Sequence, residues 1–442
     1  MIEFINEYVF GISVPILLMV CGLFYCIRLK AFHFLHPIRV MKSLFVKEKK
    51  GGVSSAKALA LALAGTLGVG NMVGVASAIV LGGYGAVFWM WVSALIAMIL
   101  KYAEIVLAMR HRRFDKSGVP HGTAMYYIKD FFKGSRTGTI ISALFALLCI
   151  FNALSMGSMI QVNAAAKAME GFFGIPAILV GCVFALIAFW AMSRGTSGIL
   201  NFTGKLVPFM TGGFVILSVT VICMCPNDAL RALGLIFENA FSVKSGVGGI
   251  GGFLTAGALR YGTMRGILSN EAGCGTAPMA HAVSDCSIPA KQGVWGIFEV
   301  FVDTILLCSL TALVIIIGGG SNLVGDDYMM ITVNSYAAVL GELAGGFISI
   351  SVLLFGLATV LCWGHYGMES VVYLSAKKVY LRAFVLIYSV CVCLGSVLSG
   401  EFIWQTADLT IGIMTVINLC MLLCMNREVK KETERYFSSN KR

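Results

Sequence analysis

Charged residues are scarce in this sequence. Only 12% of its 442 residues are Asp, Glu, Lys or Arg, whereas 58% are hydrophobic, and the mean hydropathy is +0.87. A soluble domain of this length carries roughly 25% charged residues. Apolar runs of about 20 residues recur along the whole chain and are typical of transmembrane helices. The composition therefore predicts an all-α integral membrane protein.

Catalytic and cofactor-binding motifs are also missing. The sequence has no HExxH, no GxSxG and no CxxC pair, and nearly all of its 14 cysteines lie in apolar runs, where Cys acts as a small apolar residue. The longest hydrophilic stretches, 28–57 and 110–137, leave no room for a nucleotide-binding fold. We expect neither an enzyme nor a cofactor, and no nucleic-acid partner, because no basic patch interleaved with aromatic residues occurs.

Eleven transmembrane spans are predicted within one transporter domain, 1–442. The first apolar run follows Glu3 and Glu7 rather than a basic segment, and no small-residue cleavage site follows it, so we expect it to remain as a helix. Three spans exceed the length that a bilayer requires and are expected to be tilted, broken or extended. The predicted cores are 7–28, 56–82, 84–110, 138–165, 174–193, 203–224, 247–283, 290–319, 344–376, 380–398 and 407–426.

Basic residues are concentrated in every second connection between these spans, including 28–57, 110–137 and the tail 427–442. The alternate connections are poor in Lys and Arg and carry Asp326, Asp327, Glu342 and Glu401 instead. By the positive-inside rule, the N-terminus is outside and the C-terminus is in the cytoplasm, and the membrane is expected to be a bacterial inner membrane. This topology accounts for the net charge of +11.

Two spans are interrupted by glycine and polar residues. The second span contains "GTLGVGNMVG" (65–74), and the seventh contains "SNEAGCGTAP" (269–278). Close helix packing through small residues is one interpretation of such clusters. The other is unwound backbone, which is tolerated at membrane depth only inside protein or beside a watery cavity. Because the two segments lie five spans apart, we favour two inverted five-span repeats, 56–224 and 247–426, with 7–28 as an extra helix.

Several long motifs resemble one transporter family. They are "GTLGVGNMVGVASAIVLGGYGAVFWMWVSALIAMILKYAE" (65–104), "GSMIQVNAAAKAM" (157–169), "RGILSNEAGCGTAPMAHA" (265–282), "FVDTILLCSLTALVI" (301–315) and "TADLTIGIMTVINL" (406–419). Together they are similar to the alanine or glycine:cation symporter family, from about residue 54 to the last span. Departures from the family pattern occur at Val69, Cys274 and Thr276.

The resemblance implies the fold of the leucine-transporter superfamily, with eleven spans in this branch. It also implies sodium-driven uptake of small neutral amino acids, mainly alanine and glycine. The three departures leave the fold unaffected but bear on substrate preference. The sequence does not rank alanine, glycine, serine and D-amino acids, nor does it give the stoichiometry; we expect a monomer in the lipid bilayer.

Physical chemistry assigns roles to the two interruptions. N–H groups after Gly68–Asn71 suit a substrate carboxylate, because a helix N-terminus is partly positive. Carbonyl groups at 66–69 and 268–271 suit an ammonium group and sodium, which takes hard oxygen ligands. The residues predicted to bind the amino acid are Gly68, Gly70, Asn71, Met72, Gln161, Ser269, Asn270, Gly273, Thr359 and Trp363. The residues predicted to bind sodium are Thr66, Val69, Asn71, Asp303, Thr304 and Thr359.

Two intramembrane carboxylates leave alternatives open, because such residues are functional candidates by default. For Glu271 the functional alternatives are an ion ligand and a proton carrier. The structural alternatives are a partner of Arg265 and a cap on the next half-helix, and we favour a structural role. Asp303 has no basic neighbour in sequence, which favours ion coordination or a hydrogen-bond hub. A proton-coupled symporter that uses Glu271 or Asp303 is the alternative function. Lys101 and Glu104, three residues apart, are expected to pair.

Overall fold

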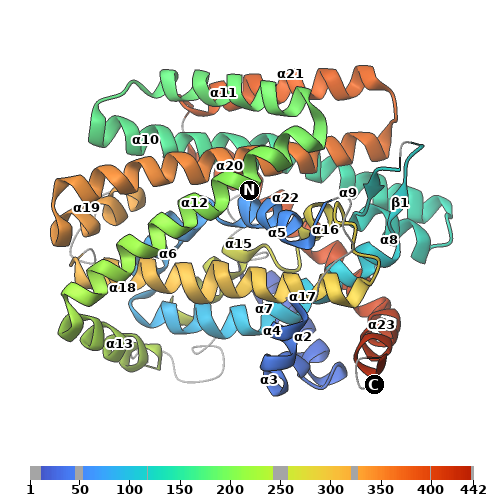
Figure 1. Cartoon of the computed structure of the whole chain (residues 1–442), viewed down its shortest axis with the longest axis horizontal. Helices are drawn as coiled ribbons and strands as arrows, with labels where there is room; N and C mark the ends of the chain where they lie inside the picture. Colours follow the sequence, from blue (N-terminus) through green and yellow to red (C-terminus); the bar gives the residue numbers. More distant parts are fainter. Residues whose placement is uncertain are drawn as a thin grey trace.

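The protein is almost entirely helical in the computed structural model, which describes residues 11–44, 53–116, 118–241, 257–319, 327–398 and 400–439. Long helices lie side by side across the molecule (Figure 1). The elements of the first half are α2 (Gly11–Arg28), α3 (Phe32–Leu35), α4 (Pro37–Leu44), α5 (Ser55–Thr66), η2 (Gly70–Gly74), α6 (Val75–Gly82), α7 (Gly85–Arg110), β1 (Arg113–Phe114), β2 (Pro120–His121), α8 (Ala124–Phe131), α9 (Arg136–Leu154), η3 (Ser155–Ile160), α10 (Gln161–Phe173), α11 (Ala177–Ser193), α12 (Gly195–Met224) and α13 (Pro226–Ala240).

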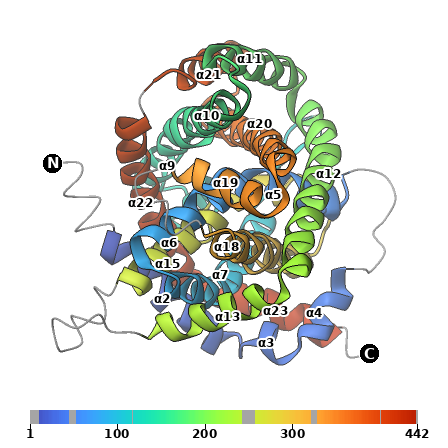
Figure 2. The same cartoon turned by 90° about the vertical axis from the view of Figure 1, so that its left-hand side faces the viewer.

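The second half has the same character. Its elements are α15 (Gly257–Asn270), α16 (Ala277–His281), α17 (Pro289–Val300), η4 (Phe301–Cys308), α18 (Ser309–Ile317), α19 (Tyr328–Leu340), α20 (Glu342–Leu374), α21 (Lys378–Gly395), α22 (Gly400–Cys424) and α23 (Asn426–Ser439). Viewed along the helices, α5, α18 and α19 lie near the centre, while α11, α12, α21 and α22 lie at the periphery (Figure 2).

Seven helical stretches of the described residues are long and apolar enough to cross a membrane. The number rises to eight when the bent pair Ser55–Thr66 and Gly70–Gly82 is counted as one span. Shorter apolar helices cover Ser13–Arg28 and Ala177–Ser193, where the first and fifth spans were predicted. The beginnings of the predicted spans 7–28 and 247–283 lie outside the described residues. The all-helical membrane architecture is therefore confirmed, whereas the count of eleven stays a prediction.

Both predicted interruptions are breaks in helical structure. The first separates α5 from the η2–α6 segment, with a bend of 54°. The second separates α15 from α16, and Glu271, Gly273 and Gly275 there have φ of +51°, +87° and +79°. Glycine adopts such angles readily, whereas Glu271 does so under strain. The third over-long span is not broken: α20 is one helix of 33 residues, about 50 Å long.

Three short segments of π-helix interrupt long helices near these breaks. They are η2, η3 and η4, and they contain or directly precede the polar residues Asn71, Gln161 and Asp303. A π-helical turn adds a residue to a helix and redirects the side chains around it, and such turns are frequent at functional sites. The three turns therefore mark where the helices depart from regular geometry to build one site.

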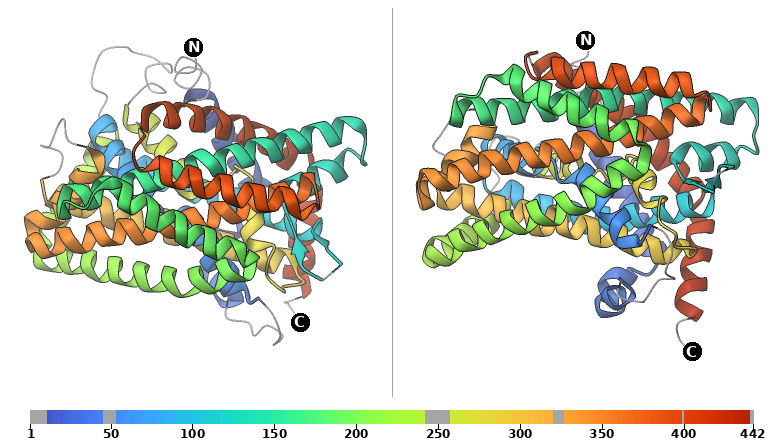
Figure 3. Two further views of the ribbon diagram at one scale, coloured as in Figure 1. Left: turned by 90° about the horizontal axis from the view of Figure 1, so that it is seen from above. Right: turned by 45° about the horizontal axis from the view of Figure 1, so that its top comes forward.

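The predicted hydrophilic connection 110–137 and the tail are folded. β1 pairs antiparallel with β2, and His121 of β2 is bonded to Glu369 of α20 through its Nδ1 atom at 2.8 Å, which raises the pKa of this imidazole. The tail forms α23, which projects at one end of the bundle (Figure 3). Glu428 and Glu432 of α23 pair with Arg110 at the end of α7.

Helix α15 packs against α7 through two glycines with GxxxG spacing. A Cβ on Gly262 would lie 2.2 Å from the carbonyl oxygen of Ala86, and one on Gly266 would lie 2.5 Å from Oγ of Ser93. Membrane helices associate largely through such close packing, because lipid supplies no hydrophobic force between them. The two glycines therefore fix the distance between α7 and the broken helix α15.

We expect Gly262→Ala to destabilise the protein by about 1–3 kcal/mol, because the new Cβ clashes with backbone that cannot move freely. Gly212→Ala in α12 is the matched control, since no atom lies within 4 Å of a Cβ built there. Apparent melting temperatures in detergent check both variants. Equal melting temperatures would show that this helix contact does not need glycine.

Candidate functional site

Asp303 of η4 is the centre of a buried polar cluster between the two breaks. Its carboxylate accepts hydrogen bonds from Nδ2 of Asn71 (2.7 Å), Oγ of Ser269 (2.9 Å) and Oγ1 of Thr304 (2.7 Å). Nδ2 of Asn270 in turn donates to Oγ1 of Thr304 at 3.3 Å. Asp303, Thr304 and Asn270 are 0% exposed. The first break, the second break and η4 therefore meet at this carboxylate.

The negative charge of Asp303 lacks a basic partner. No Lys, Arg or His of the described residues forms an ion pair with it, and Oδ1 of the neighbouring Asn71 is buried without a hydrogen-bond partner. A buried charge is costly unless it is paired or coordinates a metal ion. The oxygens of Asp303, Asn71, Ser269 and Thr304 are the hard ligands that small cations prefer.

A second group of predicted residues surrounds the unwound turn of the first break. Oε1 of Gln161 accepts the N–H of Val69 at 3.1 Å. A Cβ on Gly68 would lie 2.8 Å from both Oε1 of Gln161 and Oγ1 of Thr359. Thr359 also donates to the carbonyl of Phe355 at 3.1 Å. The first break, α10 and α20 thus converge on Gly68.

Backbone groups of the first break are more occupied than the sequence predicts. The N–H of Val69 is bonded to Gln161, and the N–H of Gly68 donates to the carbonyl of Thr66 at 2.8 Å. The carbonyl of Val69 accepts from the N–H groups of Met72 and Val73. A substrate carboxylate that binds here has to replace some of these short local bonds.

Glu271 joins the second break to α20. Its carboxylate accepts hydrogen bonds from Nε1 of Trp363 (3.2 Å) and from Oγ1 of Thr276 (2.8 Å), the residue before α16. The ring of Trp363 is 0% exposed and packs on Gly157, where a Cβ would lie 2.2 Å from it. Glu271 therefore bonds to the side chain of the residue before the next half-helix and not to the backbone N–H groups that a cap would satisfy.

Lys101 does not pair with Glu104, so this prediction is wrong. Its Nζ atom lies 2.6 Å from the carbonyl oxygen of Asn270 and 3.1 Å from Glu299 of α17, which is also bonded to His281 at 2.9 Å. The ammonium group of Lys101 is thus hydrogen-bonded to one of the carbonyls that were predicted to bind solute. Lys101 reaches both partners because α7 packs along α15 and α17.

Glu104 stabilises the same break from one turn further along α7. Its Oε1 atom accepts the N–H of Gly275 at 3.0 Å and Nδ2 of Asn418 at 2.5 Å. Nδ2 of Asn418 also donates to the carbonyl of Gly273 at 2.8 Å. These bonds satisfy unwound backbone that would otherwise be left unpaired within the membrane.

The predicted site residues thus fall into two groups and a remainder. Asn71, Ser269, Asn270, Asp303 and Thr304 are joined by hydrogen bonds, and Gly68, Val69, Gln161 and Thr359 adjoin one another. Three further predicted residues adjoin these groups: Gly70 approaches Ser269, and backbone hydrogen bonds join Thr66 to Gly68 and Met72 to Val69. The other two contact neither group in the described residues, since Gly273 packs on Leu18 and Leu419, and Trp363 contacts Glu271.

The sequence interpretation missed Glu299, His281 and Asn418. Glu299 and His281 lie within or beside predicted spans, and ionisable residues at that depth are a recognisable signal of function. Asn418 is an uncharged amide in the last span and carries no such signal. The described residues contain no cluster of three or more His, Cys, Asp or Glu side chains suited to a transition metal.

Comparison with known proteins shows the relatives of this chain. It is 34% identical over 447 residues to the "Sodium/alanine symporter AgcS" of Methanococcus maripaludis, covering 99% of this chain and 96% of that protein. An uncharacterized transporter of Haemophilus influenzae is 35% identical over 438 residues, covering 98% of this chain and 95% of that protein.

Among solved structures, the crystal structure of MhsT in complex with L-phenylalanine aligns with a TM-score of 0.62 at 12% identity, covering 88% of this chain and 93% of that one. This likeness shows the fold, which is that of the leucine transporter. The profile of the sodium:alanine symporter family matches residues 1–442. The chain is thus a transporter and not an enzyme, and it belongs to the sodium:alanine symporter family.

Proposed function

We propose that this protein takes up small neutral amino acids, alanine and glycine first, together with sodium by alternating access. The observation that carries the proposal is the buried carboxylate of Asp303, which has no basic partner among the described residues and is surrounded by oxygen ligands. Membership of the sodium:alanine symporter family supports the same coupling. No cofactor other than the coupling ion enters the proposal.

Sodium binds at Asp303 in this account. The ion takes one oxygen from the carboxylate and the unpaired Oδ1 of Asn71, while the hydroxyls of Ser269 and Thr304 rotate their protons away. Because Asn71 belongs to the first broken helix and Ser269 to the second, one bound cation joins the two breaks. Sodium binding therefore favours a single arrangement of the two helices.

The amino acid binds beside Gly68. Gly68 packs tightly against Gln161 of α10 and Thr359 of α20, since a Cβ there would lie 2.8 Å from both, so the substrate enters when these two side chains move. The N–H of Val69 donates to the substrate carboxylate when Gln161 releases it. A small side chain is favoured because the surrounding residues are buried: Gln161 is 6% and Thr359 1% exposed.

The larger architecture is part of the same proposal. We infer eleven spans in two inverted repeats, 56–224 and 247–426, with α2 as an added helix, and a monomer in a bacterial inner membrane with its N-terminus outside. The basic elements β1, β2, α8 and α23 then lie in the cytoplasm. The buried site residues correspond to a closed state between the outward-open and inward-open states.

The direct test is uptake of labelled alanine into proteoliposomes. We expect accumulation with an inward sodium gradient and none when potassium replaces sodium at equal pH. Accumulation that follows a proton gradient instead would contradict sodium coupling and support the alternative in which Glu271 or Asp303 carries a proton. Absence of accumulation under both gradients would contradict the substrate class, and binding of other small amino acids would then be measured.

Gly68→Ala is expected to lower the efficiency of alanine transport by tenfold or more, because its Cβ would lie 2.8 Å from Gln161 and Thr359 and displace both. Gly74→Ala, in the same broken helix, is the matched control, since no atom lies within 4 Å of that Cβ. Initial rates over a range of alanine concentrations measure both variants. Equal loss in the two would place the substrate away from Gly68.

A further inference from the structure

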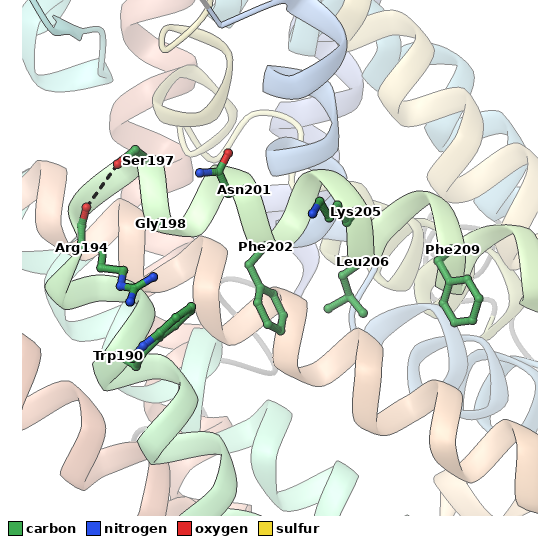
Figure 4. A pocket seen from close by; sticks show the side chains of 9 residues that line it. All are labelled: Trp190, Arg194, Ser197, Gly198, Asn201, Phe202, Lys205, Leu206 and Phe209. Atoms are coloured by element: carbon green, nitrogen blue, oxygen red, sulfur yellow. Dashed lines mark hydrogen bonds between the residues drawn. The ribbon is translucent and has the colours of Figure 1, made fainter.

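A pocket of about 540 Å³ lies on the outside of the bundle, where α11 turns into α12. All of its lining residues come from these two helices and their connection, so it is separate from the buried site (Figure 4). Trp190 and Phe209, near its two ends, are 50% and 75% exposed. Such exposed aromatic residues on a membrane protein face lipid.

One side of the pocket is polar and basic. Ser197, Asn201 and Lys205 follow one another at i, i+4 and i+8 along α12, Arg194 precedes them, and none of the lining residues is acidic (Figure 4). Neither basic side chain forms an ion pair with a carboxylate among the described residues. The guanidinium of Arg194 stacks on the ring of Trp190, 3.9 Å from its centroid, which holds the side chain in one orientation while its N–H groups stay available.

The other side of the pocket is apolar. Phe202, Leu206 and Phe209 are spaced at i, i+4 and i+7 along α12, and their side chains point to the same side of the helix (Figure 4). From Phe202 to Phe209 the helix rises about 10 Å, which fits within one leaflet of a bilayer. The pocket therefore has a polar, basic stripe that begins at the α11–α12 connection, and an apolar stripe beside it on α12.

We propose that this pocket binds an anionic phospholipid. The phosphate and the acidic headgroup lie along the polar stripe that contains Arg194, Ser197, Asn201 and Lys205, and the acyl chain follows Phe202, Leu206 and Phe209 on the adjacent side of α12. Helical side chains point toward the N-terminus of their helix, so Lys205 extends toward Asn201 and the surface. Basic pockets beside membrane helices bind such headgroups by charge attraction, and the leaflet is the one on the side of the α11–α12 connection.

The test uses purified full-length protein, depleted of lipid, in detergent. Melting temperature is followed against added phosphatidylglycerol, against phosphatidylcholine with the same acyl chains, and against soluble glycerol phosphate. We expect stabilisation by phosphatidylglycerol at much lower concentration than by phosphatidylcholine, and none by glycerol phosphate. Equal effects of the two lipids would overturn the proposal, as would stabilisation by glycerol phosphate alone, which would assign the pocket to a free phosphate.

The double substitution Arg194→Gln and Lys205→Gln is expected to raise the half-saturating concentration of phosphatidylglycerol roughly 30-fold, since each basic residue near a membrane surface contributes about fivefold. Lys377→Gln with Lys378→Gln, in the exposed α20–α21 connection, is the matched control. An unchanged half-saturating concentration in the Arg194/Lys205 variant, or equal increases in this variant and the Lys377/Lys378 control, would overturn the proposal. If the double variant does not fold, each single variant is measured, with about fivefold loss expected.

A second copy of the chain is the competing occupant of this surface. Light scattering after size-exclusion chromatography separates the two cases. Lipid binding predicts the same mass for the protein and for the double variant. A dimer that dissociates in the double variant would assign the surface to a protein contact and contradict the lipid site.

Discussion

A carboxylate enclosed in a membrane protein without a basic partner is the constraint on which the rest of this structure depends. Asp303 is 0% exposed, and hydrogen bonds from Asn71, Ser269 and Thr304 are its contacts. Hydrogen bonds alone do not neutralise a charge at this depth. The three donors come from the two broken helices and from η4, so this one carboxylate joins both breaks.

Unwound backbone in a membrane needs hydrogen-bond partners, and α7 supplies them at the second break. Lys101 binds the carbonyl of Asn270, and Glu104 accepts the N–H of Gly275, so both charged residues of one helix hold the second break. Removing one member of such a buried network leaves an uncompensated charge, which typically costs about 3–5 kcal/mol. The first break is held more lightly, because no charged side chain bonds its backbone in the described residues and the uncharged Gln161 accepts the N–H of Val69. This asymmetry leaves the first break freer to rearrange than the second.

Much of this site could be predicted from the sequence because its signals are local. Glycines and polar residues inside apolar runs indicated both breaks, and an isolated acid indicated Asp303. The partners of Lys101 could not be predicted in this way, because the Lys101–Glu104 pairing assumed neighbours on one helix. In the structure, both charges face segments that are distant in sequence: Lys101 contacts Asn270 and Glu299, and Glu104 contacts Gly275. Folded elements outside the membrane, such as the β1–β2 hairpin, had no apolar periodicity that would reveal them.

Equilibrium binding of radioactive sodium to the purified protein, without amino acid, tests the central claim most directly. The account predicts saturable binding that Asp303→Asn abolishes, while Glu271→Gln retains it because Glu271 contacts Trp363 and Thr276 rather than the Asp303 cluster. Melting curves establish that both variants are folded. Sodium binding by Asp303→Asn at the affinity of the unmodified protein would contradict the account and place the coupling ion elsewhere.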